Sequence, residues 1–507
     1  MKYRWKKRPY AHQVQAIKKL LSTGFGGALL MEPRTGKTKV VVDYASILHL
    51  AGKVNRILVF TPVAGLGVWE DEIATNCPVK YRILIWDRKT RRGRKRRGTR
   101  TPTPLPPFGD DILDFVIINY DALSTAGAVM GHDSEGNIRR SKSWGGRFTI
   151  KKEIIKWQPQ LIVLDESHRI KSPSARKSTM IHSLQKIPDY RVIMTGTVVT
   201  KKKRIFDIYS QWKFVNPERF ADMTFSEFRA RYGRWLEKNG YKQWIRNIHE
   251  RELHTMIHHD SFSIMREECY DIPRSTSQII HIDLEESAET YDRMAEDMVA
   301  KIRTGEITEA SIRLVQGMRL KHITSGISKT VPSSTHPNGH WVIIGSEKLR
   351  MLRSRLEDLL DSDEKVVIGA VWRPDILRIQ KLCAAMRVPY FTVQGGMSRP
   401  DREYARVQFP KVDGGAVFIG QPASAGEAID LSCASIMIWY SLTSSWVNYR
   451  QFSDRIALSD RPTFYEFFLA RGTYDELLYQ VLLEDGDIGK AMITSPDRLL
   501  RFEEWDD

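Results

Sequence analysis

The 507-residue sequence has few cysteines, no long apolar run and fewer acidic than basic residues. Its four cysteines, Cys77, Cys269, Cys383 and Cys433, are too sparse for a disulfide framework and too widely spaced for a C-x-x-C metal site. We therefore expect a reducing compartment. No stretch is long and apolar enough for a membrane span, and the basic amino terminus lacks the apolar segment of a secretory signal. These absences predict a cytoplasmic protein with no membrane partner.

The charge balance points to an anionic partner. Lys and Arg number 78 against 61 Asp and Glu, which gives a formal net charge of +17 and a pI of about 9.5. A chain this basic is typical of nucleic-acid binding, although a merely basic surface is the alternative. Hydrophobic residues make up 42% of the chain, so it has enough apolar side chains to form folded cores.

Short apolar runs followed by helical patterns occur in two clusters. The first comprises residues 57–61, 114–120, 161–166 and 191–197, and the second comprises 365–372, 389–395, 416–420 and 435–441. Val- and Ile-rich strands that alternate with helices are typical of buried parallel sheets. We predict an α/β fold with two parallel-sheet domains, at 1–200 and 341–507, separated by a mainly helical insertion at 201–340.

The stretch "GALLMEPRTGKTKVVVDYASIL", which starts at Gly27, resembles a phosphate-binding loop. An apolar run leads into Gly36-Lys37-Thr38, and a helical pattern follows. Gly36 would let the backbone approach phosphate at the helix N-terminus, Lys37 would reach the β and γ phosphates, and Thr38 would hold Mg²⁺. Met31 stands where the strict pattern has its first Gly.

A second motif, "LIVLDESH", ends an apolar strand in Asp165-Glu166. A carboxylate at the carboxyl end of a strand can hold Mg²⁺, and its neighbour can activate a water molecule. The alternative is a solvated acidic turn. Together the two motifs predict a site that hydrolyses a nucleoside triphosphate.

These motifs resemble those of the Swi/Snf-type branch of superfamily-two helicases, which tolerate a residue other than Gly at the first loop position. "DESHRIKSPSARKSTMIHSL" is similar to motif II, "ILVFTPVAGLGVWEDEI" to motif Ia, "FVIINYDAL" to motif Ib and "VIMTGTVVTKKKRIFDIYSQWKFVNPERF" to motif III. "VIGAVWRPDILRIQKLC" resembles motif IV, "VQGGMSRPDREYARVQF" the segment after it, "SAGEAIDLSCAS" motif V and "YRQFSDRIALSDRPTFYEFFLARGTYDELL" motif VI with its tail. The resemblance spans nearly the whole chain.

The resemblance implies two RecA-like lobes with ATP and Mg²⁺ in the cleft between them. The residues that it implies for ATP are Gln13, Glu32, Pro33, Arg34, Thr35, Gly36, Lys37, Thr38, Gly426 and Asp430. The implied catalytic residues are Lys37, Asp165, Glu166, Gln451 and Arg455, with Mg²⁺ on Thr38 and Asp165, and the implied coupling residues are His168, Thr195, Gly196 and Thr197. Gln13 is the expected adenine reader, and a plain surface helix residue is the alternative.

Double-stranded or branched DNA is the implied partner of a monomeric motor, and DNA-bound proteins are possible targets. The residues that the resemblance places on DNA are Thr61, Pro62, Trp69, Asn119, Tyr120, Arg402, Ser424 and Ala425. Nine Lys or Arg residues lie within positions 88–100, among them Arg91, Arg92, Arg94, Lys95, Arg96 and Arg97. We expect this run to contact nucleic acid, and a solvated insertion or a nuclear address is the alternative.

The chain also departs from the family pattern. Motif III lacks its usual Pro and Asn, because Val198, Val199 and Thr200 stand there, and motif V has Glu427 and Asp430 in place of a Gly and an Asn. In motif VI, Arg455 matches the first of two usual arginines, and Leu458 replaces the second. Arg461, three residues further on, is a candidate for the second role.

Three functions are consistent with these observations. The leading hypothesis is an ATP-dependent translocase on duplex DNA, in a bacterium or a phage, that remodels forked, branched or protein-bound DNA in replication or repair. A strand-separating DNA or RNA helicase is the second. The third is a DNA-binding or annealing protein with an impaired motor, which the Leu458 substitution favours and which the intact Lys37, Asp165 and Glu166 oppose.

Overall fold

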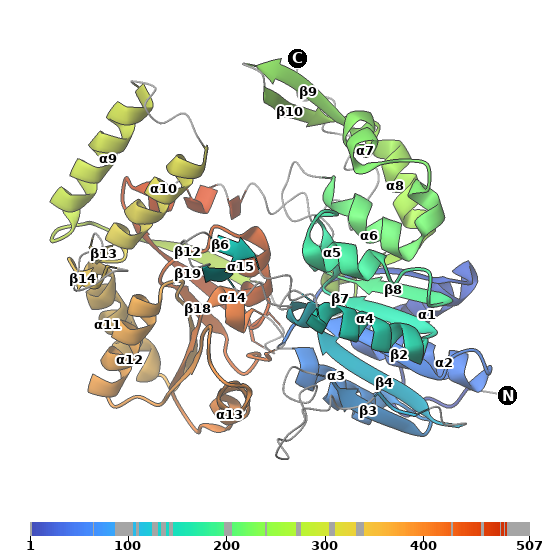
Figure 1. The fold of residues 1–507 in the computed structure, drawn as a ribbon. Coiled ribbons are helices and arrows are strands. Elements are labelled where there is room, and N and C mark those ends of the chain that lie inside the picture. Colours follow the sequence, from blue (N-terminus) through green and yellow to red (C-terminus); the bar gives the residue numbers. More distant parts are fainter. Residues whose placement is uncertain are drawn as a thin grey trace. The chain divides into compact units, whose positions relative to one another are not determined.

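The computed structural model divides the chain into two compact units, Met1–Tyr270 and Asp271–Gly486 (Figure 1). The residues that it describes are 3–63, 65–86, 105–107, 111–123, 130–132, 138–140, 145–196, 205–238, 241–269, 275–303, 310–330, 339–426, 429–457, 461–476, 478–480 and 482–483. The basic run at 88–100, Thr197 to Thr200, Glu427 and Leu458 therefore lie outside the described residues. In the part of the chain that is described, no helix is long and apolar enough to cross a membrane.

The first unit is built on a seven-stranded sheet in the order β11-β1-β8-β7-β2-β4-β3, and every strand pair is parallel. Its strands are β1 (Gly26–Met31), β2 (Arg56–Thr61), β3 (Tyr81–Ile85), β4 (Leu113–Asn119), β7 (Leu161–Asp165), β8 (Tyr190–Met194) and β11 (Ser261–Ile264). All six residues of β1 are buried, as expected of a central strand with helices on both faces.

Helices cover both faces of this sheet. They are α1 (Ala11–Thr23), α2 (Lys37–Leu50), α3 (Gly65–Asn76), α4 (Gly145–Trp157), α5 (Arg176–His182), α6 (Asp207–Val215), α7 (Phe225–Tyr232) and α8 (Glu250–His259). Successive residues of β1 point to opposite faces: Leu29 joins a core with α1, α2 and α3, whereas Leu30 joins a core with α4, α5 and α6. The ends of the strands are thereby left for the site.

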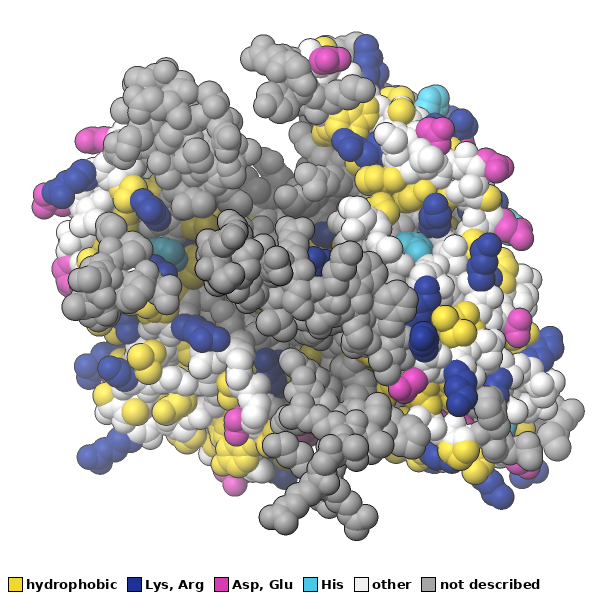
Figure 2. All heavy atoms as spheres, viewed as in Figure 1, with side chains coloured by type: hydrophobic (Ala, Val, Ile, Leu, Met, Phe, Trp, Pro, Cys, Tyr) yellow, Lys and Arg dark blue, Asp and Glu magenta, His cyan; other side chains and the backbone are white. Residues whose placement is uncertain are grey.

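Short elements complete the first unit. They are the 3₁₀ turns η2 (Tyr120–Leu123), η3 (Ser167–Ile170), η4 (Pro217–Phe220) and η5 (Arg266–Glu268), the strands β5 (Met130–His132) and β6 (Ile138–Arg140), and the hairpin of β9 (Gly233–Lys238) and β10 (Tyr241–Asn247). Charged side chains of both signs are spread over the visible face of this unit (Figure 2).

The second unit has its own six-stranded parallel sheet, in the order β12-β19-β18-β15-β17-β16. Its strands are β12 (Ser275–Ile282), β15 (Lys365–Gly369), β16 (Tyr390–Val393), β17 (Ala416–Gly420), β18 (Ile436–Trp439) and β19 (Thr463–Ala470). Its other elements are α9 (Ala288–Arg303), α10 (Ala310–Thr324), the hairpin β13 (Ile327–Lys329) and β14 (Trp341–Ile343), α11 (Glu347–Leu360), α12 (Arg373–Ala385), α13 (Arg399–Gln408), η6 (Phe409–Lys411), α14 (Pro422–Ala425) and α15 (Trp446–Ser453). The predicted α/β class with two parallel-sheet lobes is confirmed.

The predicted boundaries at 200 and 340 differ from the division that the structure shows. The segment 201–340 is not one insertion, because its first part carries α6, α7 and α8 and adds β11 to the edge of the first sheet beside β1. Its second part adds β12 to the edge of the second sheet beside β19. Main-chain hydrogen bonding to a sheet edge therefore assigns each part to a different unit.

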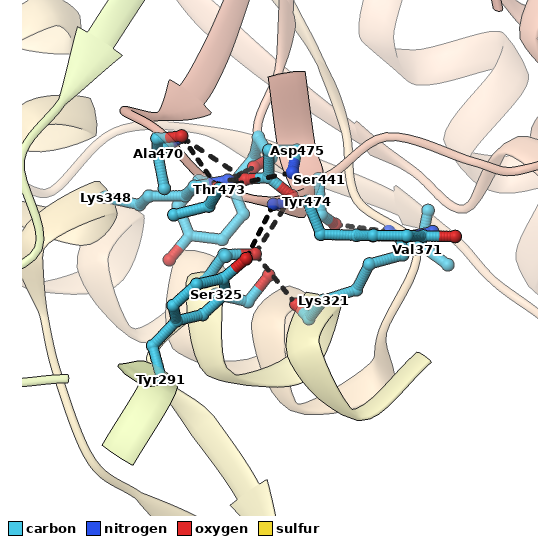
Figure 3. A network of polar contacts seen from close by, with 12 residues as sticks. Tyr291, Lys321, Ser325, Lys348, Val371, Ser441, Ala470, Thr473, Tyr474 and Asp475 are labelled. Carbon is cyan, nitrogen blue, oxygen red and sulfur yellow. Dashed lines mark hydrogen bonds and ion pairs between the residues drawn. The ribbon is translucent and has the colours of Figure 1, made fainter. Parts of the chain in front are cut away.

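A buried polar network joins the added helices of the second unit to its sheet (Figure 3). Lys348 Nζ on α11 lies 2.5 Å from Asp475 Oδ2, and the two side chains are 2% and 5% exposed. The hydroxyl of Thr324 on α10 donates to Asp475 Oδ1 at 3.0 Å, and Tyr291 on α9 accepts the backbone N–H of Tyr474 at 2.7 Å. Because an ion pair stripped of one partner is costly when buried, this network holds α9, α10 and α11 in place.

Candidate functional site

The loop between β1 and α2 has the backbone of a phosphate-binding loop. Gly36 precedes α2 with φ +82°, and Arg34 also adopts a positive φ, +69°, which is uncommon for a residue other than Gly. The side chain of Lys37 bends back over the loop, where Nζ donates to the carbonyls of Met31 at 2.8 Å and Glu32 at 3.1 Å. The loop and the first turn of α2 therefore lie around one buried cation.

Gln13 lies against this loop. Its side-chain Nε2 donates to the carbonyl of Thr35 at 3.3 Å, and His12 Nε2 contacts the same oxygen at 2.9 Å. A methyl group at Gly36 would stand 2.1 Å from Gln13 Nε2, so a larger residue there would displace the Gln13 side chain. Gln13 is 3% exposed, which excludes the alternative of a plain surface residue.

Asp165, at the carboxyl end of β7, is held by two side chains from the neighbouring elements. Its Oδ2 accepts from the hydroxyl of Thr61 on β2 at 2.8 Å and from the indole Nε1 of Trp69 on α3 at 3.0 Å. Tyr120 adds a third contact, because its hydroxyl donates to the Asp165 carbonyl at 2.7 Å. The motif II carboxylate thus has a fixed orientation.

These contacts correct the predicted DNA contacts at Thr61, Pro62, Trp69 and Tyr120. Thr61, Trp69 and Tyr120 are at most 1% exposed, and Pro62 is also buried. Burial makes these four side chains unavailable to a ligand at the surface. Three of them, Thr61, Trp69 and Tyr120, form hydrogen bonds with Asp165. Asn119 is partly buried, and its side-chain oxygen accepts from the backbone N–H of Ala122 at 2.8 Å.

Burial and the charge of the adjacent Glu166 raise the pKa of Asp165. Burial contributes most and the Glu166 charge next, and together they raise the pKa of Asp165 to about 6, against hydrogen bonds from Trp69 and Thr61 and the charge of Lys37, which lower it. A divalent cation would relieve this repulsion, so the donor set fits Mg²⁺. Asp165 and the Thr38 hydroxyl, at the start of α2, are the residues that would hold it.

Glu166 lies close to His168 and Thr195, two of the predicted coupling residues. Glu166 adopts φ +51°, and its Oε2 lies 3.2 Å from His168 Nδ1, which in turn is 3.4 Å from the hydroxyl of Thr195 after β8. A methyl group at Gly196 would stand 2.8 Å from the ring of Pro33, so Gly at this position lets the segment after β8 pack on the phosphate-binding loop. These contacts form a continuous path from motif II to motif III and to the loop.

Two partners of this site, Arg266 and Gln211, escaped the sequence analysis. The backbone N–H of Arg266 in η5 donates at 3.0 Å to the buried carboxylate of Glu32, so this predicted ATP residue anchors another segment. Gln211 on α6 accepts from the buried hydroxyl of Ser167 at 2.6 Å. Both contacts join residues far apart in the sequence, so they form only through the fold.

In the second unit, motifs V and VI pack together. A methyl group at Gly426 would stand 3.5 Å from Cβ of Gln451, and Arg455 donates to the carbonyls of Gln451 at 2.8 Å and Ile429 at 3.3 Å. Asp430 is exposed, and its Oδ1 accepts from the backbone N–H of Ser432 at 2.9 Å.

Two predicted DNA residues of this unit have defined surroundings. Ala425 is fully buried, so a side-chain contact with DNA is excluded there, whereas Ser424 is partly exposed. Arg402 is also partly exposed and donates to the carbonyl of Gln394 at 3.4 Å.

Arg461 lies elsewhere in the second unit. Its guanidinium pairs with Glu364 at 2.9 Å, and Arg461 and Glu364 precede β19 and β15 respectively. Arg461 therefore sits at the amino ends of the parallel strands, whereas motif V follows the carboxyl end of β17. Ligands of such sheets bind at the carboxyl ends, which places Arg461 at the wrong edge for the second catalytic role.

The model of the SNF2-related domain matches residues 12–327, more than half of the chain. The chain belongs to the SNF2-related family. Relatives of this SNF2-related chain include the ATP-dependent DNA helicase DDM1 of Arabidopsis thaliana, 22% identical over 465 residues, which cover 86% of the chain and 55% of the relative. Another is the ISWI chromatin-remodeling complex ATPase CHR11 of the same plant, 21% identical over 437 residues, which cover 84% of the chain and 37% of the relative.

The SNF2-related chain thus spans about half the length, or less, of the curated relatives it matches. Among solved structures, the Sulfolobus solfataricus SWI2/SNF2 ATPase core in complex with dsDNA covers 98% of the chain and is itself covered to 97%, with 18% identity and a TM-score of 0.41.

Proposed function

We propose that the protein is a DNA-stimulated ATPase that translocates along double-stranded DNA. The observation that carries this proposal is the convergence of Lys37, Asp165 and Glu166 at the carboxyl edge of one parallel sheet, in a chain of the SNF2-related family. Such an edge is where α/β sheets bind ligands, and a loop lysine with two carboxylates is the set that phosphoryl transfer to water requires.

The site residues of the first unit have separate roles in the proposed hydrolysis of ATP. Lys37 leaves the loop carbonyls of Met31 and Glu32 to bind the terminal phosphates, and Glu166 accepts a proton from the attacking water. Mg²⁺, held by Thr38 and Asp165, would neutralise charge on the β and γ phosphates. Trp69 and Thr61 keep the Asp165 carboxylate oriented, and Gln13, beside the phosphate-binding loop, is the residue that we propose to read the adenine.

Arg455 is the arginine that we propose to stabilise the transition state from the second unit, with Gln451 beside it. An arginine in this role is worth about 10³–10⁵ in rate. The path from Glu166 through His168 and Thr195 to Gly196 and Pro33 is the proposed means by which the state of the nucleotide reaches the rest of the first unit.

The finer assignments rest on the family and on the charge of +17. We propose that the substrate is forked, branched or protein-bound duplex DNA and that the protein works as a monomer. The relatives carry the names of a DNA helicase and of a chromatin-remodeling ATPase, and both names fit action on DNA. Remodelling in replication or repair, in a bacterial or phage-infected cytoplasm, is the proposed setting.

A parallel ATPase assay tests the proposed function. Hydrolysis is measured without nucleic acid and with duplex DNA, forked DNA, single-stranded DNA and RNA, for the wild type, Lys37→Ala and Glu166→Gln. We expect the strongest stimulation by duplex or forked DNA, no turnover with either variant and retained ATP binding with Glu166→Gln. Stimulation by single-stranded DNA or RNA alone indicates a strand-separating helicase, and DNA binding without hydrolysis indicates an impaired motor.

A further inference from the structure

The hairpin β9–β10 projects from the first unit beyond the end of α7 (Figure 1). A two-stranded ribbon has little stability by itself, and this one is held on one face only. Trp235 and Trp244 are paired directly across the ribbon and pack as partly buried side chains against the core of the first unit. Trp235 also stacks on Phe206 with ring centroids 5.6 Å apart, and the Arg229 guanidinium lies 4.1 Å from the Trp235 ring centroid.

The neighbouring cross-strand pair consists of two arginines. Arg234 and Arg246 are partners in the antiparallel register, and both are exposed. Side chains of directly opposite residues start about 4.5–5.5 Å apart, and like charges in such pairs are destabilising. Neither guanidinium forms an ion pair with any residue that the structure describes. By contrast, Arg231 in the preceding helix pairs with Glu252 at 2.8 Å.

The composition of the segment increases this positive charge. Residues 229–247 contain six Lys or Arg residues and one acidic residue, Glu237. A shift in register between Trp244 and Arg246 places Ile245 as an extra residue, a bulge that twists the ribbon, and Ile245 and Leu236 are 45% and 53% exposed. Opposed cations without carboxylate partners repel each other, and an anion bound between or against them would relieve this repulsion.

We propose that the β9–β10 ribbon is a DNA-contacting element, with Arg234 and Arg246 bound to phosphates of the duplex backbone. A two-stranded ribbon has the width that the major groove of B-DNA admits, and phosphate contacts supply affinity that is independent of sequence. The inference rests on the proposed function, because it identifies where the first unit grips its duplex. The two arginines would make contacts with DNA that the buried side chains of Thr61, Trp69 and Tyr120 cannot make.

The test compares two double variants of the full chain. Arg234→Ala with Arg246→Ala removes the opposed pair, and Lys18→Ala with Lys53→Ala removes two exposed cations elsewhere on the same unit. Binding to a fluorescent duplex is followed by anisotropy over a range of salt concentrations. We expect the arginine variant to lose on the order of tenfold in affinity and to reduce the log–log salt slope by about 1.8, because two phosphate contacts are lost at about 0.9 each. The lysine variant should retain both values.

Arg234→Glu separates DNA contact from folding. This change converts the like-charge pair into an opposite-charge pair, so thermal stability should stay the same or rise while duplex affinity falls below that of Arg234→Ala. Equal losses in the two double variants, or an unchanged slope in the arginine variant, overturn the inference. If the wild type binds duplex DNA and the arginine variants bind it equally well, the inference fails and the proposed function stands. If the wild type neither binds duplex DNA nor is stimulated by it, both the inference and the proposed function are refuted. Binding to a protein partner in place of DNA appears as unchanged DNA affinity and also refutes the inference.

Discussion

Trp69 donates its indole N–H to the carboxylate of Asp165, with Nε1 3.0 Å from Oδ2. Thr61 donates to the same oxygen, so the orientation of the motif II carboxylate depends on two side chains that never reach the surface. In the proposed mechanism Asp165 holds Mg²⁺, and loss of either donor should therefore reduce turnover without abolishing ATP binding.

Trp69→Phe tests this relationship, because it keeps an aromatic ring in the core and removes the donor. A hydrogen bond to a charged group is worth about 1.5–3 kcal/mol, so kcat should fall at least about tenfold. Trp86→Phe is the matched control, because Trp86 is also fully buried in the first unit and its indole N–H has no hydrogen-bond partner among the described residues. Steady-state ATPase rates that fall equally in the two variants would assign the effect to packing alone.

Gly36→Ala should weaken ATP binding, because the added methyl group would displace the Gln13 side chain from the loop. The added methyl group would stand 2.1 Å from Gln13 Nε2, at a backbone φ of +82°. Gly24→Ala is the control for backbone strain, because Gly24 has nearly the same φ, +80°, with nothing within 4 Å of the added carbon. Both variants should lose about 1–2 kcal/mol of stability from the left-handed conformation, but only Gly36→Ala should lose ATP affinity in a titration calorimetry experiment. Equal ATP affinities would contradict the contact between Gln13 and the loop.

The two arginines of motif VI should behave differently. Arg455→Ala should cut DNA-stimulated turnover by at least ~10³ while leaving ATP affinity nearly intact, because the contact forms mainly in the transition state. Arg461→Ala should have little effect, because Arg461 pairs with Glu364 at the amino ends of the strands. Leu458→Arg restores the family spacing and should raise turnover. Full activity in Arg455→Ala would show that other residues complete the site.

The stability of the second unit should depend on the protonation of Asp375. Asp375 on α12 is fully buried beside the hydroxyl groups of Ser325 and Ser441. Burial raises the pKa of Asp375 to about 7, although hydrogen bonds from Ser325 and Ser441 and the charges of Lys348 and Arg378 oppose this change. An unfolded aspartic acid has a pKa of about 3.9, so the folded chain holds this proton more tightly, and the Asp375 contribution to stability is lost as pH rises from about 4 to about 7.

Asp375→Asn removes this titration. Relative to the wild type, the variant should gain about 2 kcal/mol of unfolding free energy between about pH 5.5 and about pH 8.5. Urea denaturation at the two pH values measures the difference, in which the titration of all other groups cancels. A difference between variant and wild type that does not change with pH would show that Asp375 stays ionised in the folded chain.

The sequence predicted the elements that carry the nucleotide site because those elements are central strands. β1, β2, β7 and β8 are buried on both faces, so their apolar runs and the polar residues that end them are visible in the sequence. The edge strands β11 and β12 were missed, since β11 is short and β12 is mostly exposed. This is why the boundaries at 200 and 340 were misplaced.

The roles of Trp69, Thr61 and Tyr120 could not be predicted from the sequence, for a related reason. A motif gives the position of a side chain along the chain but not whether it faces solvent or a neighbour. Asp165 lies on β7, and its partners come from β2, α3 and η2, which the crossovers of the parallel sheet bring together. Only the packed sheet shows that these residues support the carboxylate.

Displacement of a third strand from a DNA triplex is the most direct test of translocation along duplex DNA. In this assay a motor that moves along the duplex removes the third strand without separating the duplex. The account predicts displacement that requires ATP, occurs with the wild type and is absent with Glu166→Gln, although this variant still binds ATP and DNA. DNA-stimulated hydrolysis by the wild type with no displacement of the third strand, or displacement that proceeds equally without ATP, would contradict it.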